Sequence, residues 1–247
     1  MRSNSIKTVL FGFCIIILAW SAISFVSAVP IIPQPFDVAK TLFFVFSDTI
    51  IVHLVYSVFR ILVGVLIASI LGYLLGVFMG YIPLIGRLFS PIVYLSYPIP
   101  KIALLPIIML FLGIGEMSKL TIVFLIVFFQ VVVVVRDAVI ALPEEYFFPL
   151  YSLGSSFHDV LRHVVFPATL PKLFSAIRVA MATAISVLFF TETFGTDYGI
   201  GYYIMDAWLR VNYLEMYAGI VVLSLVGLLL FLVIDGMEYY FCRWQYK

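Results

Sequence analysis

The feature that most constrains this chain is a series of apolar runs, each about 20 residues long or longer and almost free of charge. A hydrocarbon core about 30 Å thick requires about 20 apolar residues in an α-helix. Charged residues make up 11% of the chain, less than half of the roughly 25% found in soluble domains. So few charges cannot cover a water-facing surface, and the sequence therefore predicts an all-α, polytopic membrane protein.

Six runs are long and apolar enough to be transmembrane helices. The third contains Pro91, Pro98, Pro100 and Pro106, and prolines at this density remove several helical hydrogen bonds. We expect this span to be kinked or discontinuous, with protein or water covering the freed backbone groups. Residues 36–48 are amphipathic and are expected at the membrane interface. The six predicted spans cover about residues 9–29, 50–81, 88–113, 117–138, 168–193 and 214–236.

The first run has two interpretations. Val26-Ser27-Ala28 resembles the small-residue site at which a signal peptide is cleaved. The apolar run is longer than the core of a typical signal peptide, which favours an uncleaved anchor, and Pro30 and Pro33 end it. We therefore expect the first helix to remain in the mature protein.

The positive charges indicate the orientation of the spans, because Lys and Arg gather in the cytoplasmic connections of membrane proteins. With a cytoplasmic N-terminus, eight lie inside and three outside, while Arg60, Lys101 and Arg178 lie near or within spans. We therefore expect a multi-pass protein of the cell membrane with both termini in the cytoplasm. The inside residues are Arg2, Lys7, Arg87, Arg136, Arg162, Lys172, Arg243 and Lys247, and the outside residues are Lys40, Lys119 and Arg210.

The overall composition argues against two kinds of site. Lys and Arg number 14 against 13 Asp and Glu, whereas a nucleic-acid-binding protein needs a marked excess of positive charge. The only cysteines, Cys14 and Cys242, lie far apart, and no two histidines have the i, i+4 spacing of a zinc-binding helix. We expect neither nucleic-acid binding nor a metal site.

The longest inside loop, residues 140–167, exceeds what a simple connection requires. Apolar residues recur at helical spacing on both sides of Gly154-Ser155-Ser156, and Ser156 with Asp159 has the form of a capping box. This pattern predicts two short helices outside the membrane, joined at a glycine turn, with the second ending before Pro167. It also fits an ordinary amphipathic hairpin that rests on the lipid headgroups.

Several motifs, in the same order along the chain, resemble one family. Gly154, followed by Val164-Val165-Phe166-Pro167, resembles the glycine and the I-x-L-P ending of the cytoplasmic loop in importer permeases of the ATP-binding cassette (ABC) class. Five further motifs resemble the nitrate/sulfonate/taurine branch of that class: His53-x-x-x-Ser57-x-x-Arg60, the stretch Pro98 to Pro106, Gly113-Ile114-Gly115-Glu116-x-x-Lys119, Glu192-Thr193 and Gly199-Ile200-Gly201-Tyr202.

The resemblance covers about residues 48–244 and implies the transmembrane-domain fold of a type I ABC importer at 49–244, after an N-terminal helix and interfacial segment at 1–48. One part of the loop departs from the family. An acidic residue and two alanines usually stand six to four positions before the glycine, where this chain has Phe148, Pro149 and Leu150. We expect this change to reshape the first short helix and its fit to a partner.

The resemblance also implies partners. The phosphate-binding pattern G-x-x-x-x-G-K-[ST] is missing, since no lysine follows a glycine. We expect no cofactor on this chain, ATP and Mg²⁺ on a pair of cytoplasmic ABC ATPase subunits, and a substrate-binding protein outside. One chain offers few polar groups to line a pathway, so a second permease chain is expected, most simply in a homodimer. A heterodimer with a related permease is the alternative.

Three groups of candidate residues follow, and each has a structural alternative. Arg60 could pair or snorkel, Lys101 could lie beside a mere kink, and hydroxyls in the fifth span could bond to their own helix. The ATPase-coupling candidates are Glu144, Glu145, Gly154, Ser155, Ser156, Phe166 and Pro167; the pathway candidates are Arg60, Pro100, Lys101, Thr183 and Ser186; and the outer gate or docking candidates are Glu192, Gly199, Gly201 and Tyr202.

The expected function is therefore that of a non-enzymatic permease subunit in an ATP-driven importer. Arg60 and Lys101 favour a small anion such as a sulfonate or nitrate, and a neutral heterocyclic vitamin precursor is the alternative substrate. An ion-driven secondary transporter would be expected to show intramembrane carboxylates or an inverted repeat, and neither is evident in the sequence. An intramembrane enzyme would need a nucleophile with a positioned base, a carboxylate pair or a metal motif, which the sequence also lacks.

Overall fold

The computed structural model describes residues 3–27, 29 and 31–246, and every regular element in this part of the chain is a helix, which confirms the all-α prediction. Short 3₁₀ or π turns lie between or after the α-helices at Phe46–Ile50, Lys101–Leu104, Glu144–Tyr146, Leu161–Val165 and Arg243–Tyr246. The α-helices are α1 (Ser3–Ser27), α2 (Pro35–Val45), α3 (Ile51–Tyr81), α4 (Pro83–Ser96), α5 (Leu105–Leu112), α6 (Glu116–Ile140), α7 (Phe148–Ser152), α8 (Phe157–Val160), α9 (Phe166–Thr191), α10 (Ile200–Leu209) and α11 (Tyr213–Phe241).

Four continuous helical segments within the described residues are long and apolar enough to cross a membrane, and a fifth arises if the bent pair formed by α4 and α5 counts as one span. In α1 the described apolar part, Phe11–Ser27, is shorter. The predicted count of six therefore stays a prediction. So does the choice between an anchor and a cleaved signal peptide, because Ala28 and Pro30 lie outside the described residues.

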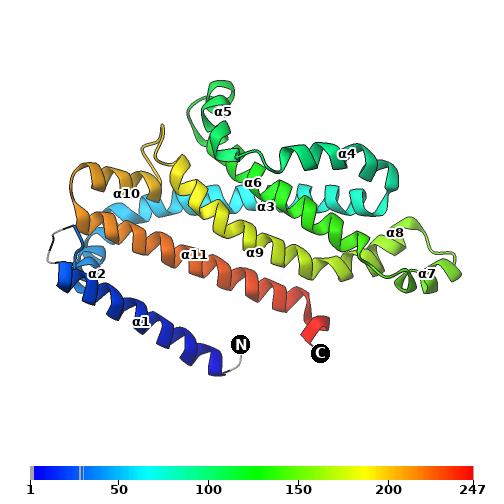
Figure 1. The fold of residues 1–247 in the computed structure, drawn as a ribbon, viewed down its shortest axis with the longest axis horizontal. Helices are drawn as coiled ribbons and strands as arrows, with labels where there is room; N and C mark the ends of the chain where they lie inside the picture. The colour runs from blue at the N-terminus through cyan, green and yellow to red at the C-terminus, as the bar shows by residue number, and fades with distance from the viewer. Residues whose placement is uncertain (1–2, 28, 30, 247) are drawn as a thin grey trace.

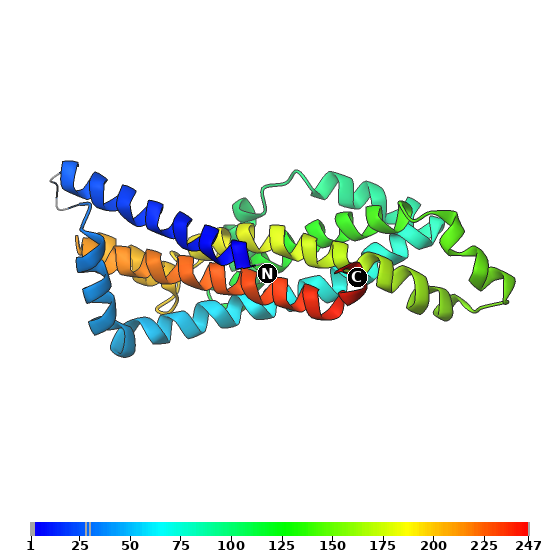
Figure 2. The same ribbon diagram turned by 90° about the horizontal axis from the view of Figure 1, so that it is seen from below.

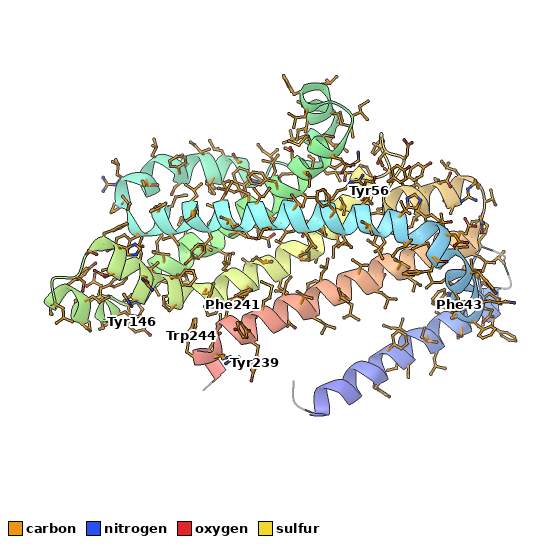
Figure 3. The ribbon with its side chains drawn as sticks, turned by 180° about the vertical axis from the view of Figure 1, so that it is seen from behind. Phe43, Tyr56, Tyr146, Tyr239, Phe241 and Trp244 are labelled. Atoms are coloured by element: carbon orange, nitrogen blue, oxygen red, sulfur yellow. The ribbon has the colours of Figure 1, made fainter. Side chains whose placement is uncertain are left out.

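The long helices run side by side and give the molecule two ends (Figure 1). At one end, here called the α10 end, α10 lies near the junction of α2 and α3, and α2 crosses the ends of the longer helices in the second view (Figure 2). At the other, the hairpin end, α7 and α8 project beyond the bundle. Tyr56 and Tyr146 lie toward these opposite ends (Figure 3).

The core of the bundle is the contact between α3 and α6. Small residues recur at every fourth position of α3, and buried valines recur at every fourth position of α6. A Cβ atom added at Gly76 would come within 2.9 Å of the Val135 Cβ, so the two backbones lie too close for a larger side chain. The two stripes are Gly64, Ala68, Gly72, Gly76 and Gly80 on α3, and Val123, Val127, Val131, Val135 and Val139 on α6.

The third predicted span is discontinuous, as its prolines indicated. α4 ends at Ser96, a 3₁₀ turn follows at Lys101–Leu104, and the two halves of the pair meet at an angle of 84°. α5 projects away from the long helices (Figure 1). The bend leaves the Ser96 carbonyl with only a turn hydrogen bond from the Ile99 N–H at 3.3 Å, and it frees the Tyr97 carbonyl, which determines the surroundings of Lys101 described below.

The prediction that the second short helix ends before Pro167 is wrong. α8 continues through the π turn Leu161–Val165 into α9, and Phe157–Thr191 is one helical segment of 35 residues. In the π turn the Phe166 N–H bonds to the Leu161 carbonyl, which widens the helix just ahead of the proline ring. Pro167 follows directly in the first turn of α9, and the widened turn ahead of it makes room for the proline ring.

Candidate functional site

A group of buried charges lies at the α10 end, here called the Arg60 cluster and formed by Ser57, Arg60, Glu116 and Glu192. The Arg60 side chain is 0% exposed and the Glu192 side chain 1%, whereas that of Glu116 is 44% exposed. Arg60 binds Glu116 through two hydrogen bonds, from Nε at 2.6 Å and Nη2 at 2.5 Å, and donates to Glu192 at 2.7 Å. The cluster thus joins α3, the start of α6 and the end of α9.

Further acceptors complete the surroundings of Arg60. Its Nη1 also donates to the Tyr198 carbonyl at 2.7 Å and its Nη2 to the Thr196 hydroxyl at 3.3 Å. A guanidinium has five N–H groups, so the chain's own acceptors occupy all of them. In this conformation Arg60 has no free donor for a solute, and its pathway role stays a prediction.

The N-terminus of α10 is capped by side chains from other helices. The backbone N–H of Gly199 donates to His53 Nδ1 at 3.2 Å, that of Ile200 to the Ser57 hydroxyl at 2.8 Å, and that of Gly201 to the Glu192 carboxylate at 2.9 Å. These are the N–H groups that a helix cannot satisfy internally, and a carboxylate beside them is favoured by the helix dipole. α3 and α9 therefore fix the position of α10.

Both glycines of this turn are required by their surroundings. Gly199 has a φ of 135°, and a Cβ atom there would lie 2.4 Å from the Glu192 carboxyl carbon. A Cβ atom at Gly201 would lie 2.4 Å from the Phe189 carbonyl oxygen. The structure thus brings together three of the gate candidates, and Tyr202 adjoins them by stacking on the His53 ring. Their role as a gate stays a prediction.

A second candidate site is a hollow of about 350 Å³ at the bend after α4, here called the Lys101 hollow. Lys101 Nζ donates to the carbonyl groups of Ser96 at 2.7 Å and Tyr97 at 2.6 Å, which the bend has freed. The ammonium also lies 5.2 Å from the centre of the Phe129 ring. Tyr97, Ile99, Lys101 and Ile102 line the hollow from the bend, Ile126, Phe129 and Gln130 from α6, and Thr183 and Val187 from α9.

The structure therefore brings together only two of the predicted pathway residues, Lys101 and Thr183. Pro100 immediately precedes Lys101 at the start of the 3₁₀ turn. Ser186 lines a different hollow, between α9 and α11, and its hydroxyl donates to the Ala182 carbonyl. The placements leave the pathway assignments as predictions.

A third candidate region is the hairpin of residues 144–160, which contains α7 and α8. Gly154 makes the turn with a φ of 67°, and the predicted capping box is present, with Ser156 and Asp159 bonding each other's side chain and backbone. The Tyr81 hydroxyl contacts the Tyr151 hydroxyl at 3.2 Å and ties the hairpin to the end of α3. Large apolar side chains at the tip are exposed, namely Phe148 at 56% and Leu153 at 81%.

The other coupling candidates lie along this region. Glu144 and Glu145 are exposed in the 3₁₀ turn that precedes α7, and Ser155 follows the glycine turn. Phe166 and Pro167 lie in the first turn of α9, where the Phe166 ring meets Tyr73 edge-on. All seven are thus at the hairpin end, and their coupling role stays a prediction. Among the described residues, no group of three or more His, Cys, Asp or Glu is placed to hold a metal ion.

Three residues that matter to these sites did not stand out in the sequence. Ser57 and Glu116 were noted only as members of motifs, although they complete the Arg60 cluster. Gln130 was not noted, although it lines the Lys101 hollow. A polar residue inside an apolar run is the signal that could have found Ser57 and Gln130, whereas Glu116 lies in the short connection between two predicted spans.

Comparison with known proteins identifies the family. A family model described as "Binding-protein-dependent transport system inner membrane component" matches residues 68–245, which include the hairpin and three long helices. The chain belongs to this family. It is therefore a multi-pass membrane component of a transport system that depends on a binding protein.

Individual relatives agree with this assignment. The taurine transport system permease protein TauC of Escherichia coli (strain K12) is 28% identical over 78% of this chain and 70% of its own length. The formylaminopyrimidine transport permease protein ThiX of Halalkalibacterium halodurans is 28% identical over 90% of this chain and 86% of its own length. The putative aliphatic sulfonates transport permease protein SsuC of Bacillus subtilis (strain 168) is 26% identical over 94% of this chain and 85% of its own length.

A solved structure shows the same fold. Inward-facing MetNI, a methionine ABC transporter, contains a chain that superposes with a TM-score of 0.63 at 20% identity, covering 76% of this chain and 95% of that one. The predicted transmembrane-domain fold of a type I ABC importer is thereby confirmed.

Proposed function

We propose that this permease is one of two chains that line the pathway of an ATP-driven importer, and that two separate ATPase subunits bind ATP and Mg²⁺. The family match carries this proposal, because it includes the hairpin as well as the long helices. The second permease chain is expected to be a copy of this one, since a pair around a two-fold axis doubles the polar groups available to a pathway.

The hairpin is the proposed contact for the ATPase. Its tip exposes Phe148 and Leu153 on the part of the hairpin that projects beyond the long helices. A partner groove that takes up α7 and moves with nucleotide binding would shift the attached long helices as a rigid body. Because Phe148, Pro149 and Leu150 replace an acidic residue and two alanines, the partner groove is expected to be more apolar than usual.

The proposed substrate is a small anion of the sulfonate kind. Two of the relatives are named for taurine and for aliphatic sulfonates, and Lys101 places a positive charge beside a hollow. A neutral heterocycle is the second candidate, because ThiX is named for formylaminopyrimidine. Binding of radiolabelled taurine by the cognate binding protein would favour the first, and binding of formylaminopyrimidine alone would overturn it.

The decisive experiment is uptake by the reconstituted transporter. The permease, its ATPase and its binding protein are placed in liposomes, and ATP-dependent taurine uptake is measured for Gly154→Arg and for Gly154→Asn. Asn tolerates the left-handed conformation and is small, whereas Arg adds bulk to the proposed contact. We expect Gly154→Arg to lose more than about 90% of uptake and Gly154→Asn to keep most of it. Uptake without ATP, or full uptake by Gly154→Arg, would contradict the proposal.

A further inference from the structure

The ammonium of Lys101 lies in a largely apolar setting without a carboxylate partner. Arg60 and Arg178 each bind two carboxylates, and Lys119 lies near Glu116 and Glu192. No acidic side chain of the described residues forms an ion pair with Lys101. An isolated charge among apolar groups is costly. The Lys101 ammonium would therefore stabilise an anion that enters the hollow.

The place of the hollow along the bundle also points to a solute. Phe129 and Gln130 lie near the middle of α6, which runs from Glu116 to Ile140. The opposite wall is the bend of 84° between α4 and α5. Transporters commonly hold their substrates near the membrane midplane at broken helices, where backbone and side-chain groups are freed from helical bonding.

The hollow offers hydrogen-bond donors that the protein leaves free. Two of the three N–H groups of Lys101 reach the carbonyls of Ser96 and Tyr97, so one remains. The Gln130 amide and the Thr183 hydroxyl have no hydrogen bond within the described chain, whereas the hydroxyls of Ser175, Ser186 and Thr191 all bond to their own helix. An ammonium, an amide and a hydroxyl from three segments therefore face one space.

The size and walls of the hollow limit what can bind. A volume of about 350 Å³ is at the small end of the range for ligand pockets. The rings of Tyr97 and Phe129 form part of its wall, and they suit a short carbon chain beside the charged group.

We propose that the Lys101 hollow is the permease's own binding site for the anionic group of a compact solute, with Lys101, Gln130 and Thr183 holding the oxygen atoms of a sulfonate or carboxylate. This deepens the proposed function, on which it rests, by assigning substrate selection in part to the permease. The solute shares the Lys101 ammonium with the freed carbonyls of α4, so the same residue holds the bend and the anion.

Charge-selective labelling of Thr183→Cys tests this site on the permease chain alone. The variant is made in a Cys14→Ser, Cys242→Ser background and held in nanodiscs of neutral lipid. It is treated with 2-sulfonatoethyl methanethiosulfonate, an anion, or with its trimethylammonioethyl analogue, a cation. Each rate is divided by that of the same reagent with free cysteine. We expect the anionic reagent to be favoured about tenfold or more, because a unit charge acts strongly over a few ångströms at low dielectric.

The controls separate the charge of Lys101 from its structural role. Adding Lys101→Met should abolish the preference, whereas adding Lys101→Arg should retain it. In the Thr183→Cys variant that keeps the native Lys101, millimolar taurine should slow labelling by the anionic reagent. The matched control is Ser186→Cys, three residues along α9 in a different hollow, which should show no anion preference and no response to Lys101→Met.

Equal labelling by both reagents, no labelling by either, or a preference that survives Lys101→Met would overturn the proposal. Uptake into liposomes distinguishes a failure of the proposed Lys101 site from a failure of the proposed importer function. If the complete transporter takes up taurine but labelling shows no preference, the permease function stands and the site is wrong. If labelling succeeds and ATP-driven uptake fails, the site stands and the importer assignment is wrong.

Discussion

At the residue scale, the Arg60 cluster shows how a chain with few charges satisfies those that it buries. Arg60 alone would be costly inside the bundle, but Glu116 and Glu192 pair with it and accept three of its five hydrogen bonds. The same carboxylate of Glu192 also caps α10. Removing one member therefore leaves the others buried without their partner.

The interaction between Arg60 and Glu192 can be measured directly. We expect Arg60→Met to destabilise the protein by about 3–5 kcal/mol, because it leaves the buried Glu192 carboxylate without a cationic partner. Glu192→Met should cost less, because Arg60 keeps its two hydrogen bonds to Glu116. The double variant should lose less than the sum, and thermal unfolding in detergent gives the three values. Arg210→Met is the control, because the Arg210 side chain is 48% exposed where it binds Asp206 and Glu215. This substitution should cost about 1 kcal/mol or less. Strict additivity would show that the pair is not coupled.

The turn before α10 gives a second prediction at this scale. Gly201→Ala should lower the unfolding midpoint by several degrees, because its Cβ atom would lie 2.4 Å from a backbone oxygen that cannot move easily. Gly236→Ala is the matched control, since nothing lies within 4 Å of a Cβ atom there and alanine favours a helix. The prediction fails if the two variants have the same midpoint.

The residues of this cluster were visible in the sequence, but their pairing was not. Arg60 and Glu192 are separated by 132 positions, and a buried arginine was expected to need some partner. Periodicity relates residues three or four apart in one helix, and it carries no information on which helices pack together. Pairing across helices follows only from the three-dimensional arrangement.

At the element scale, the contact between α3 and α6 depends on size complementarity between two stripes. Both repeats are readable from the sequence as small residues and valines at every fourth position, although that signal does not say that the two stripes meet. Boundaries were less predictable. Pro167 indicated a helix end, yet a π turn absorbs it, because widening one turn preserves most of the backbone hydrogen bonds.

Two glycines of α3 should respond differently when the glycine is enlarged to alanine and the facing valine of α6 is reduced to alanine. A Cβ atom at Gly64 would meet only the Val123 side chain closely, at 2.7 Å, whereas one at Gly76 would also lie 2.9 Å from the Val132 carbonyl oxygen. Gly64→Ala should therefore destabilise the protein and be partly rescued by Val123→Ala. Gly76→Ala should destabilise it and not be rescued by Val135→Ala. Unfolding midpoints of the singles and doubles check this, and equal rescue at both sites would contradict it.

At the scale of the whole molecule, the two ends differ in chemistry as well as in shape. The α10 end buries the ion pair between Arg60 and Glu192 and caps a short helix, whereas the hairpin end exposes apolar side chains on a projecting turn. α11 ends toward the hairpin end, and α1 meets α2 at the α10 end (Figure 1). The distribution of Lys and Arg predicts that the hairpin end is cytoplasmic, because these residues are enriched in the cytoplasmic connections of membrane proteins.

Labelling from one side of the membrane tests that orientation. Leu153 on the hairpin is 81% exposed and Val211 after α10 is 65% exposed, so a cysteine at either place should be accessible to an impermeant maleimide. In intact cells that make the permease without its ATPase, with Cys14 and Cys242 replaced by serine, Val211→Cys should be labelled and Leu153→Cys should not. Leu153→Cys should become reactive once the membrane is opened, which shows that its thiol is accessible. The reverse pattern in intact cells would invert the topology, and it would place the hairpin where no cytoplasmic ATPase could reach it.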